Sequence, residues 1–341
     1  MNTAKNNQST RQGKTNINKM NVLITGGSGF IGTNLIEELS KAGANIVNFD
    51  TKKPRNVTHS KFWKEGDVLD RNSLEKVARD FSPHYLVHLA ARTDLLSTLS
   101  SDYAVNRDGV SNIITMTTQA KELKLAIYAS SRYIFGTGSC QGGKFDYSPT
   151  NEYGRSKVDG ERLVRRQDKD CKPWMIVRPT SIWGPWFSHP YSGFFNAVRR
   201  GAYLHPRGVR ASKSYGFVGN ITYQLVKFME LDPKLLHERA LFLADYEPLE
   251  VYDWANRIRA MEGKSKVPEV PYRMMRLMAK AGDLIESCLN DVVAPLSTRR
   301  LNNLIENVQF DMSETKELIG DLPFSMDESV LSTIKWIKEK R

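Results

Sequence analysis

The segment MNVLITGGSGFIG, residues 20–32, joins a short apolar run to a glycine-rich turn. Its first six residues are apolar enough for a buried strand, and apolar side chains then recur at helical spacing over residues 30–42. In the pattern G-x-x-G-x-x-G, Gly26 makes the turn, Gly29 lets the backbone approach a pyrophosphate, and Gly32 lets the helix pack closely. The helix N-terminus then offers unpaired N–H groups to phosphate, whereas the alternative is a turn without a ligand. The residues predicted to contact a dinucleotide here are Gly26, Gly29, Phe30, Ile31 and Gly32.

The second predicted strand ends in an acidic residue. Asp50 lies eighteen residues after the last glycine of the turn, where a carboxylate accepts hydrogen bonds from the adenosine ribose hydroxyls. It would repel a 2′-phosphate, which favours NAD over NADP, although Lys52 and Lys53 leave NADP as an alternative. Asp67 and Val68, in a later turn, are further candidates near the adenine, and Asp67 could equally be an ordinary loop carboxylate.

Strand-like and helix-like segments alternate over the first half of the chain. Strands are expected at 20–25, 45–50, 61–63, 85–89, 125–130 and 174–178, and helices at 30–42, 72–81 and 99–122 and through Tyr153. This alternation predicts a parallel sheet covered on both faces. Further helices are expected at 221–230, 251–261, 271–289 and 327–340.

The domain organisation follows from this pattern. We predict a Rossmann-type, doubly wound α/β domain at 20–180 that binds NAD, and a smaller, mixed α/β substrate-binding domain at 181–341. Strand and helix exchange between the two domains is expected. The smaller domain should cover the carboxyl ends of the strands, where such folds bind their ligands.

Charge and composition narrow the possible functions of this 341-residue chain. Residues 1–19 carry four basic residues and no acid, and we expect them to form a disordered basic tail. Removing the tail lowers the net charge from +11 to +7, because 45 basic residues then face 38 acidic ones. No basic run is interleaved with aromatics, which argues against nucleic-acid binding.

The cysteines and histidines indicate neither a disulfide framework nor a metal site. The three cysteines form no C-x-x-C pair, which favours a reducing, cytoplasmic setting. His84 and His88 lie in a strand-like segment, where their spacing makes no helical metal-binding face. The uncharged stretch from Pro179 to Val198 is interrupted by prolines and glycines, so we expect a loop lining a cleft and no transmembrane segment.

A tyrosine and a lysine lie four residues apart in Tyr153-Gly154-Arg155-Ser156-Lys157. On a helix these two side chains share a face and can point into one cleft. A nearby ammonium favours the phenolate form of a tyrosine, which suggests acid/base chemistry at an alcohol carbon. Alone the pair is a weak signal, because an amphipathic helix with an exposed lysine also explains it.

These features together resemble the extended short-chain dehydrogenase/reductase family, particularly its NAD-dependent nucleotide-sugar epimerases and dehydratases. The matching motifs occur in order from Met20 to the end of the chain. They are TGGSGFIG at 25–32, Asp50, HLAA at 88–91, Ser130-Ser131, Tyr153 with Lys157, RPTSIWGP at 178–185, and a C-terminal pattern from Phe310 to Trp336.

The resemblance implies roles for the residues in these motifs. Tyr153 would be the acid/base at the reacting hydroxyl, and Lys157 would hold the nicotinamide ribose and lower the tyrosine pKa. Ser131 would hydrogen-bond the substrate oxygen, with Ser130 as the alternative in register. The residues expected along the dinucleotide are Leu89, Ala90, Ala91, Pro179 and Thr180, besides Tyr153 and Lys157 themselves.

The resemblance also implies a substrate diphosphate held by cations, for which the candidates are Lys213, Arg299 and Arg300. Arg132-Tyr133 follows Ser131 where the related dehydratases carry acidic residues, so dehydration is disfavoured. Arg92 and Arg132 would meet an acidic or acylated sugar, or else face outward. Ser181 stands where many epimerases have Asn, and Gly219-Asn220 replaces a frequent acidic pair.

We therefore predict an NAD-dependent nucleotide-sugar epimerase in cell-surface glycan precursor synthesis. Transient oxidation of a sugar carbon and return of the hydride to the other face would invert that carbon. One alternative is a reductase or dehydrogenase of the same family, acting on a nucleotide sugar or a hydroxysteroid-like alcohol. Another is a non-catalytic dinucleotide sensor or RNA-binding relative. The family also implies a homodimer formed through residues 99–122 and 153–167.

Overall fold

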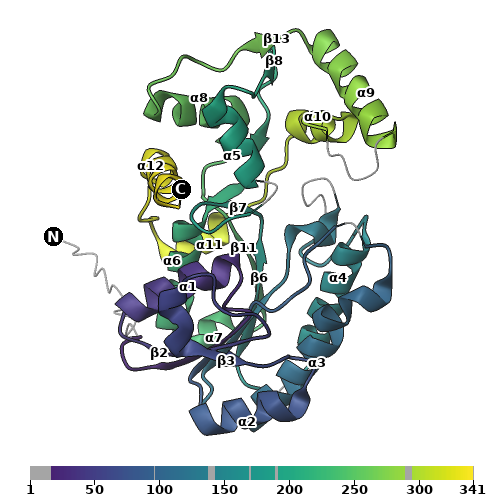
Figure 1. Cartoon of the computed structure of the whole chain (residues 1–341). Helices are drawn as coiled ribbons and strands as arrows, with labels where there is room; N and C mark the ends of the chain where they lie inside the picture. Colours follow the sequence, from purple (N-terminus) through teal and green to yellow (C-terminus); the bar gives the residue numbers. More distant parts are fainter. Residues whose placement is uncertain are drawn as a thin grey trace, which may run out of the picture.

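The computed structural model describes residues 17–95, 97–136, 143–168, 170–188, 191–288 and 294–340 (Figure 1). Its centre is a seven-stranded parallel sheet with strand order β11-β6-β5-β4-β1-β2-β3. The strands are β1 (Asn21–Thr25), β2 (Asn45–Asp50), β3 (Trp63–Glu65), β4 (Tyr85–His88), β5 (Leu125–Ala129), β6 (Trp174–Pro179) and β11 (Arg239–Leu243). The chain runs outward from β1 in both directions, and the predicted Rossmann-type doubly wound fold is confirmed.

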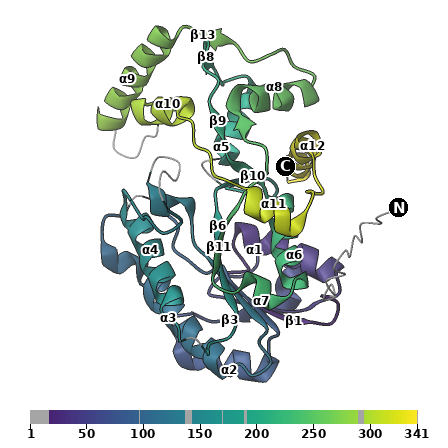
Figure 2. The ribbon, with the colours of Figure 1, turned by 180° about the vertical axis from the view of Figure 1, so that it is seen from behind.

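Two layers of helices cover the sheet. One layer contains α1 (Phe30–Lys41) packed on α6 (Val218–Glu230), and the other contains α2 (Arg71–Phe81), α3 (Ala104–Gln119) and α4 (Glu152–Arg165), packed in that order (Figures 1 and 2). Alternate residues of β1 serve the two cores, because Val22 and Ile24 pack toward α1 whereas Leu23 packs on the opposite side. The central strands are therefore apolar on both faces.

The second half of the chain builds most of the smaller lobe and also supplies β11 at the edge of the central sheet. Three two-stranded sheets lie in this half of the chain: β10 (Tyr215–Phe217) pairs with β7 (Ser181–Trp183), β12 (Leu249–Glu250) with β9 (Ser212–Lys213), and β13 (Glu269–Val270) with β8 (His205–Pro206). Trp183 stacks on Phe195 and contacts Trp254 in the core of this lobe. The remaining helices of the second half are α5 (Tyr191–Arg200), α7 (Pro233–Leu236), α8 (Val251–Met261), α9 (Tyr272–Cys288), α10 (Thr298–Ile305), α11 (Ser313–Ile319) and α12 (Met326–Glu339). Of these, α7 and α11 pack against β6 and β11 of the central sheet.

Several segment boundaries differ from the sequence expectations. The stretch from Pro179 to Val198, expected as a loop, contains β7 and most of α5, while residues 189 and 190 lie outside the described part. The expected helix 99–122 is a 3-10 turn, Ser100–Tyr103, followed by α3. In α5, Phe195 and Val198 are buried and form the apolar side of the helix. The prolines before this segment led to the expectation of a loop, although they lie outside the helix itself.

The N-terminal tail also differs from expectation where it is described. Residues 1–16 lie outside the described part of the chain. Ile17 is buried in the core with 2% exposure, and Lys19 donates its backbone N–H to Gly43 O at 2.9 Å. The folded body therefore begins by Ile17, three residues earlier than the composition suggested. No helix in the described ranges is long and apolar enough to cross a membrane.

Candidate active site

The loops that follow β1, β2, β4, β5 and β6 meet at the carboxyl edge of the parallel sheet, where doubly wound folds bind ligands. Gly26 has φ +75°, and a Cβ there would lie 2.5 Å from the backbone N of Ala90. A Cβ on Gly32 would lie 2.5 Å from Gly27 Cα. A side chain at Gly26 would push the loop after β1 away from the loop after β4. A side chain at Gly32 would push α1 away from the glycine-rich turn. The geometry thus matches the turn and close-packing roles expected of Gly26 and Gly32.

The first turn of α1 suits an anionic ligand. Gly29 is the N-cap, its N–H bonds to Gly26 O at 3.0 Å, and Phe30 and Ile31 begin the helix. In the described part of the chain no side chain caps α1, and its first turn contains no acidic residue. The free N–H groups and the helix dipole therefore favour phosphate at this point.

Asp50 ends β2 beside this turn and ties two loops together. Its Oδ2 accepts the N–H of Ser28 at 3.0 Å, and its Oδ1 accepts the N–H of Lys52 at 2.9 Å. A carboxylate has about four lone-pair sites, so acceptor capacity remains for ribose hydroxyls. Asp67 is exposed and accepts the N–H of Leu69, whereas Val68 is 3% exposed and belongs to the core.

Tyr153 and Lys157 lie on the inward face of α4, and each is 6% exposed. Asn151 caps this helix by accepting the N–H of Gly154 at 2.7 Å. Lys157 Nζ donates to Ala129 O at 2.9 Å, which ties the helix to the end of β5. The two residues of the sequence pair are thus held at the same strand end as the nucleotide loop.

Burial raises the pKa of Tyr153 to about 12, while a hydrogen bond with Ser131 acts in the opposite direction. This differs from the lowered tyrosine pKa that the resemblance implied. The physical reason is that the phenol is enclosed, with the rings of Tyr103 and Tyr133 about it, and that the Lys157 amine is directed to a backbone carbonyl. Burial also lowers the pKa of Lys157 to about 8, against the attraction of Glu161.

The buried Lys157 amine gives a pH-dependent prediction. Between about pH 8 and its ordinary pKa of 10.5, the folded protein binds fewer protons at Lys157 than the unfolded chain does. The free energy of unfolding is therefore expected to rise with pH across this window, by up to about 3 kcal/mol from this group. Urea unfolding at pH 7.5 and 10 measures the rise, and Lys157→Met should show a smaller one. Equal rises in the two proteins would contradict this account.

The structure separates the two candidate serines. Ser131 lies beside Tyr153 and caps the following 3-10 turn, Arg132–Phe135. Ser130 instead lines a small cavity of about 10 Å³, together with His88, Tyr128 and Lys157. A space of this size holds about one water molecule. The Ser130 hydroxyl has no hydrogen-bond partner among the described residues, which suits a bridging water in that cavity. The geometry therefore favours Ser131 over Ser130 at the reacting centre.

A buried ion pair beside this cavity was not anticipated from the sequence. Arg178 donates from Nε and Nη2 to the two carboxylate oxygens of Glu161 at 2.9 and 2.7 Å, and both side chains are at most 1% exposed. Tyr147 donates its hydroxyl to the same carboxylate at 2.8 Å. The available signal was Glu161 four residues after Lys157, on the same helix face.

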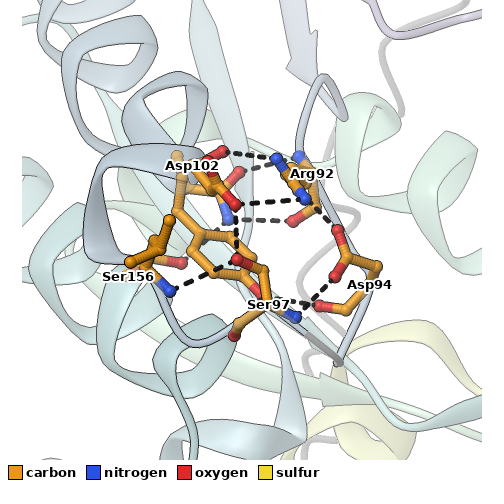
Figure 3. Close-up of polar contacts among 8 residues, drawn as sticks. Arg92, Asp94, Ser97, Asp102 and Ser156 are labelled. Carbon is orange, nitrogen blue, oxygen red and sulfur yellow. Dashed lines mark hydrogen bonds and ion pairs between the residues drawn. The ribbon is translucent and has the colours of Figure 1, made fainter.

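Arg92, a candidate contact for an acidic sugar, is engaged by two acids of its own loop region. Its guanidinium pairs with Asp94 and Asp102, as Figure 3 shows. The backbone N–H of Arg92 donates to the side-chain oxygen of Asn106, and the side-chain amide of Asn106 donates to the backbone carbonyl of Arg92. The same amide also donates to Ser156 on α4 at 2.9 Å. Arg92 therefore fixes the β4 loop, with Ala90 and Ala91, against the helix that carries Tyr153.

Two of the predicted cations come together. Arg132 lies over the ring of Tyr133 at 4.4 Å, and its Nη1 has no hydrogen-bond acceptor among the described residues. Lys213 is 5% exposed and donates to Asn303 O on α10 at 2.7 Å. Burial lowers the pKa of Lys213 to about 8, the charge of Glu306 acts against this, and the charge of Arg132 adds to the lowering. An anion placed between these two cations would relieve their repulsion.

The other substrate candidates lie elsewhere. Arg300 donates to Ala294 O at 2.6 Å and so holds its own loop. Arg299 lines an open depression of about 640 Å³ on α10. Ser181 is buried at the start of β7, in register with Tyr215. Thr180, after Pro179, donates its N–H to Leu243 O at 3.1 Å. In the described ranges no cluster of three or more His, Cys, Asp or Glu side chains could hold a metal ion.

The chain is similar to known epimerases over most of its length. It is 24% identical, over 93% of its residues and 95% of the relative, to N-acetyl-alpha-D-glucosaminyl-diphospho-ditrans,octacis-undecaprenol 4-epimerase of Escherichia coli O157:H7. It is 22% identical to UDP-glucose 4-epimerase of Vibrio cholerae, over 89% of the chain and 90% of the relative. The crystal structure of UDP-glucuronic acid 4-epimerase from Bacillus cereus in complex with NAD has a TM-score of 0.70 at 17% identity, covering 94% of this chain and 99% of that one.

Residues 22–216 match the NAD dependent epimerase/dehydratase family. The matched range includes the glycine-rich turn, Asp50, Ser131 and the Tyr153–Lys157 pair. The predictions of an enzyme of this kind and of NAD as its cofactor are confirmed. The chain therefore belongs to the NAD-dependent epimerase/dehydratase family.

Proposed function

We propose that the chain is an epimerase that inverts one carbon of a nucleotide sugar, with Tyr153 as the acid/base. The observation that carries this proposal is the placement of Tyr153, Ser131 and Lys157 at the strand ends beside the glycine-rich turn. This is the arrangement that proton transfer to and from a sugar hydroxyl requires. The substrate itself is proposed from the names of the relatives and from the cation pair described above.

The residues present fit NAD. The uncapped first turn of α1 would hold the pyrophosphate, Asp50 the adenosine ribose, and Lys157 the nicotinamide ribose. At Gly29 a Cβ would meet only Gly26 O, at 3.1 Å, so the turn is open at the glycine expected to face the pyrophosphate. The chemistry supplied by NAD, when bound, is reversible hydride exchange with a substrate carbon.

Tyr153 then moves the proton that accompanies this exchange. The Ser131 hydroxyl orients the sugar hydroxyl and Tyr153 together, because it already hydrogen-bonds the phenol. Burial raises the pKa of Tyr153, so without a ligand its phenol is neutral and can donate a proton. A positive charge placed near the phenol would favour the phenolate, which can accept the proton. The proton returns to the same oxygen, and redox state is unchanged overall because the hydride would also return to the carbon that it left.

Simple inversion is favoured over elimination. Removing water from the neighbouring carbons requires a carboxylate or similar base near Ser131. The next two positions are Arg132 and Tyr133, and the Arg132 guanidinium is a permanent cation. Arg132 therefore cannot supply that base. We propose that Arg132 instead holds the substrate diphosphate together with Lys213, because an anion between the two cations relieves their repulsion.

A second candidate substrate is a sugar diphosphate carried on a polyprenol. It is supported by the name of the Escherichia coli relative, which states such a substrate and which this chain covers over 95% of its length. The diphosphate is common to both candidates, so Arg132 and Lys213 serve either. We further propose a role in cell-surface glycan precursor synthesis in the cytoplasm, and a homodimer formed through the neighbouring helices α3 and α4.

The test is a panel of UDP-, GDP- and dTDP-sugars and one polyprenyl diphosphate sugar, followed by NMR with absorbance recorded for NADH. Inversion without net NADH supports the proposal. A stoichiometric NADH change would instead assign a dehydrogenase or reductase. No turnover across the panel, with RNA binding unaffected by Tyr153→Phe, would assign a non-catalytic relative.

Replacing Asp50 with Ala is expected to weaken NAD binding by roughly tenfold to a hundredfold, because charge-assisted hydrogen bonds to the ribose are lost. NADP binding should weaken less, since the repulsion of a 2′-phosphate is lost as well. Titration calorimetry with both dinucleotides measures the ratio. Glu65→Ala is the matched control, because Glu65 is the register partner of Asp50 on β3 and is exposed. An equal loss for both dinucleotides would contradict the assigned role.

A further inference from the structure

Helix α9 exposes an unusual number of large apolar side chains. They recur at helical spacing of three and four residues and therefore lie along one side of the helix. We call them the outer stripe: Met274, Leu277, Met278, Leu284 and Ile285, with exposed fractions of 54%, 69%, 44%, 64% and 44%. Single exposed apolar residues are ordinary on a protein surface, but a continuous stripe marks an interaction site.

The outer stripe is not the side by which α9 is attached to the protein. Met275, Ala279 and Gly282 form a different, buried side that packs against α10 and the loop before it. At Gly282 the helix approaches Leu296 so closely that a Cβ would overlap its carbonyl oxygen. Figures 1 and 2 show α9 at the outer end of the smaller lobe, away from the central sheet. The stripe is therefore presented by an anchored helix.

The charges of α9 are sorted between its two sides. Arg273, Arg276 and Lys280 are exposed, and among the described residues none of them forms an ion pair. The acids of the same helix turn inward instead. Asp283 accepts the N–H of Thr298 at 2.8 Å, and Glu286 accepts the N–H of Ala294 at 3.1 Å. The outward surface of α9 thus combines apolar side chains with positive charge alone.

We propose that α9 docks on an anionic lipid bilayer and lies in its interface, with the outer stripe at the boundary of head groups and acyl chains. Amphipathic helices bind membranes in this way, and flanking Lys and Arg side chains reach the anionic head groups. The helix has 17 residues and carries charges along one side, so it lies on the surface and does not span.

Charge complementarity decides between a membrane and a second copy of the chain. Two copies that paired through the outer stripe would bring Arg273, Arg276 and Lys280 of each close to the same cations of the other. No outward acid on α9 is available to offset that repulsion, since Asp283 and Glu286 are bonded inward. An anionic bilayer offers both apolar volume and negative charge.

The inference goes beyond the proposed function and does not depend on it, although the two are linked in space. Helix α10, against which α9 packs, also holds the Lys213 ammonium through Asn303 O. A membrane-bound α9 would therefore place the cation pair of the candidate site within one helix of the bilayer surface.

The experiment is flotation of the full chain with vesicles of phosphatidylglycerol and phosphatidylcholine, compared with vesicles of phosphatidylcholine alone. The double variant Leu277→Gln, Leu284→Gln is expected to bind the anionic vesicles roughly a hundredfold more weakly, at about tenfold per leucine removed from the interface. The control variant Val57→Gln, Leu331→Gln removes two exposed apolar side chains elsewhere, with exposed fractions of 80% and 44%, and should bind like the parent.

The positive charges are tested separately. Replacing Arg273, Arg276 and Lys280 with Gln is expected to weaken binding to anionic vesicles by about fivefold per residue, with no effect on neutral vesicles. Failure of the parent to float with anionic vesicles would overturn the proposal. So would an equal loss in the control, or a halved molar mass of the Leu277→Gln, Leu284→Gln variant in light scattering without lipid, which would assign a second copy.

Turnover keeps the two proposals distinguishable. The Leu277→Gln, Leu284→Gln variant should convert a soluble nucleotide sugar at the parent rate, because no residue of the outer stripe is assigned to the site. Vesicle binding that persists in a chain without epimerase activity would support the membrane inference and reject only the proposed function.

Discussion

Replacing Tyr153 with Phe is expected to lower sugar turnover by about a thousandfold and to leave NAD binding nearly unchanged. The loss follows from removing the only assigned proton carrier, since a positioned acid/base contributes roughly 10²–10⁴-fold. The phenylalanine keeps the ring that packs beside Tyr103 and Tyr133, so the fold should persist. NMR of the sugar gives the rate, and titration calorimetry gives the affinity for NAD.

Tyr128→Phe is the matched control for this variant. Tyr128 is also a buried tyrosine, on β5, but it lines the small cavity with Ser130 and Lys157 and is not assigned to the substrate. Its loss should change turnover by less than about tenfold. A Tyr153→Phe enzyme that kept more than a tenth of the parent rate would show that another group carries the proton.

Ser131→Ala should fall between these two results. It removes the hydrogen bond that lowers the pKa of Tyr153 and that orients the sugar hydroxyl. Ser130→Ala should have the smaller effect, because Ser130 faces the cavity and not the tyrosine. The order of the two serine variants therefore tests the choice that the sequence alone left open.

The sequence predicted the parts of the site that depend on local pattern. The glycine-rich turn and the Tyr153–Lys157 pair could be placed because turn geometry and helical spacing fix their neighbours within a few residues. Ser130 and Ser131 could not be separated, because adjacent residues at a strand end point to opposite sides and the register was unknown. The structure favours Ser131, because Tyr153, on another element, lies beside it.

The pairing of charged side chains was predicted less well. Asp94 and Asp102 lie close to Arg92 in the sequence, yet no pattern indicated that both would pair with its guanidinium. For α9, the sequence predicted a helix but not which of its two apolar sides is covered. That choice depends on α10, whose position is set by the rest of the smaller lobe.

The Glu161–Arg178 pair was missed because charged residues usually remain at the surface, and the sequence gives no sign that both are enclosed. The consequence for stability is large. Replacing Glu161 with Ala is expected to lower the free energy of unfolding by about 3–5 kcal/mol, since it leaves the Arg178 guanidinium buried without its counter-charge. Urea unfolding near pH 7 measures the loss.

Glu75→Ala is the matched control, because Glu75 also accepts from an arginine, Arg71, at 2.7 Å. That arginine is 52% exposed, and a surface pair contributes about 1 kcal/mol or less. Equal losses in the two variants would show that burial of the Glu161 pair is not the source of its effect.

The double variant Glu161→Leu, Arg178→Met separates loss of the pair from loss of a counter-charge. Replacing both partners with apolar groups removes the desolvation cost along with the attraction, so stability should recover most of what Glu161→Ala loses. The rings of Phe135, Phe145 and Phe242 around Arg178 provide an apolar site for the methionine. Catalysis should not recover in parallel, because Glu161 also raises the pKa of Lys157 against burial. A stable double variant with a lower lysine pKa and weaker turnover would show that this ion pair serves the charge of Lys157 more than it serves the fold.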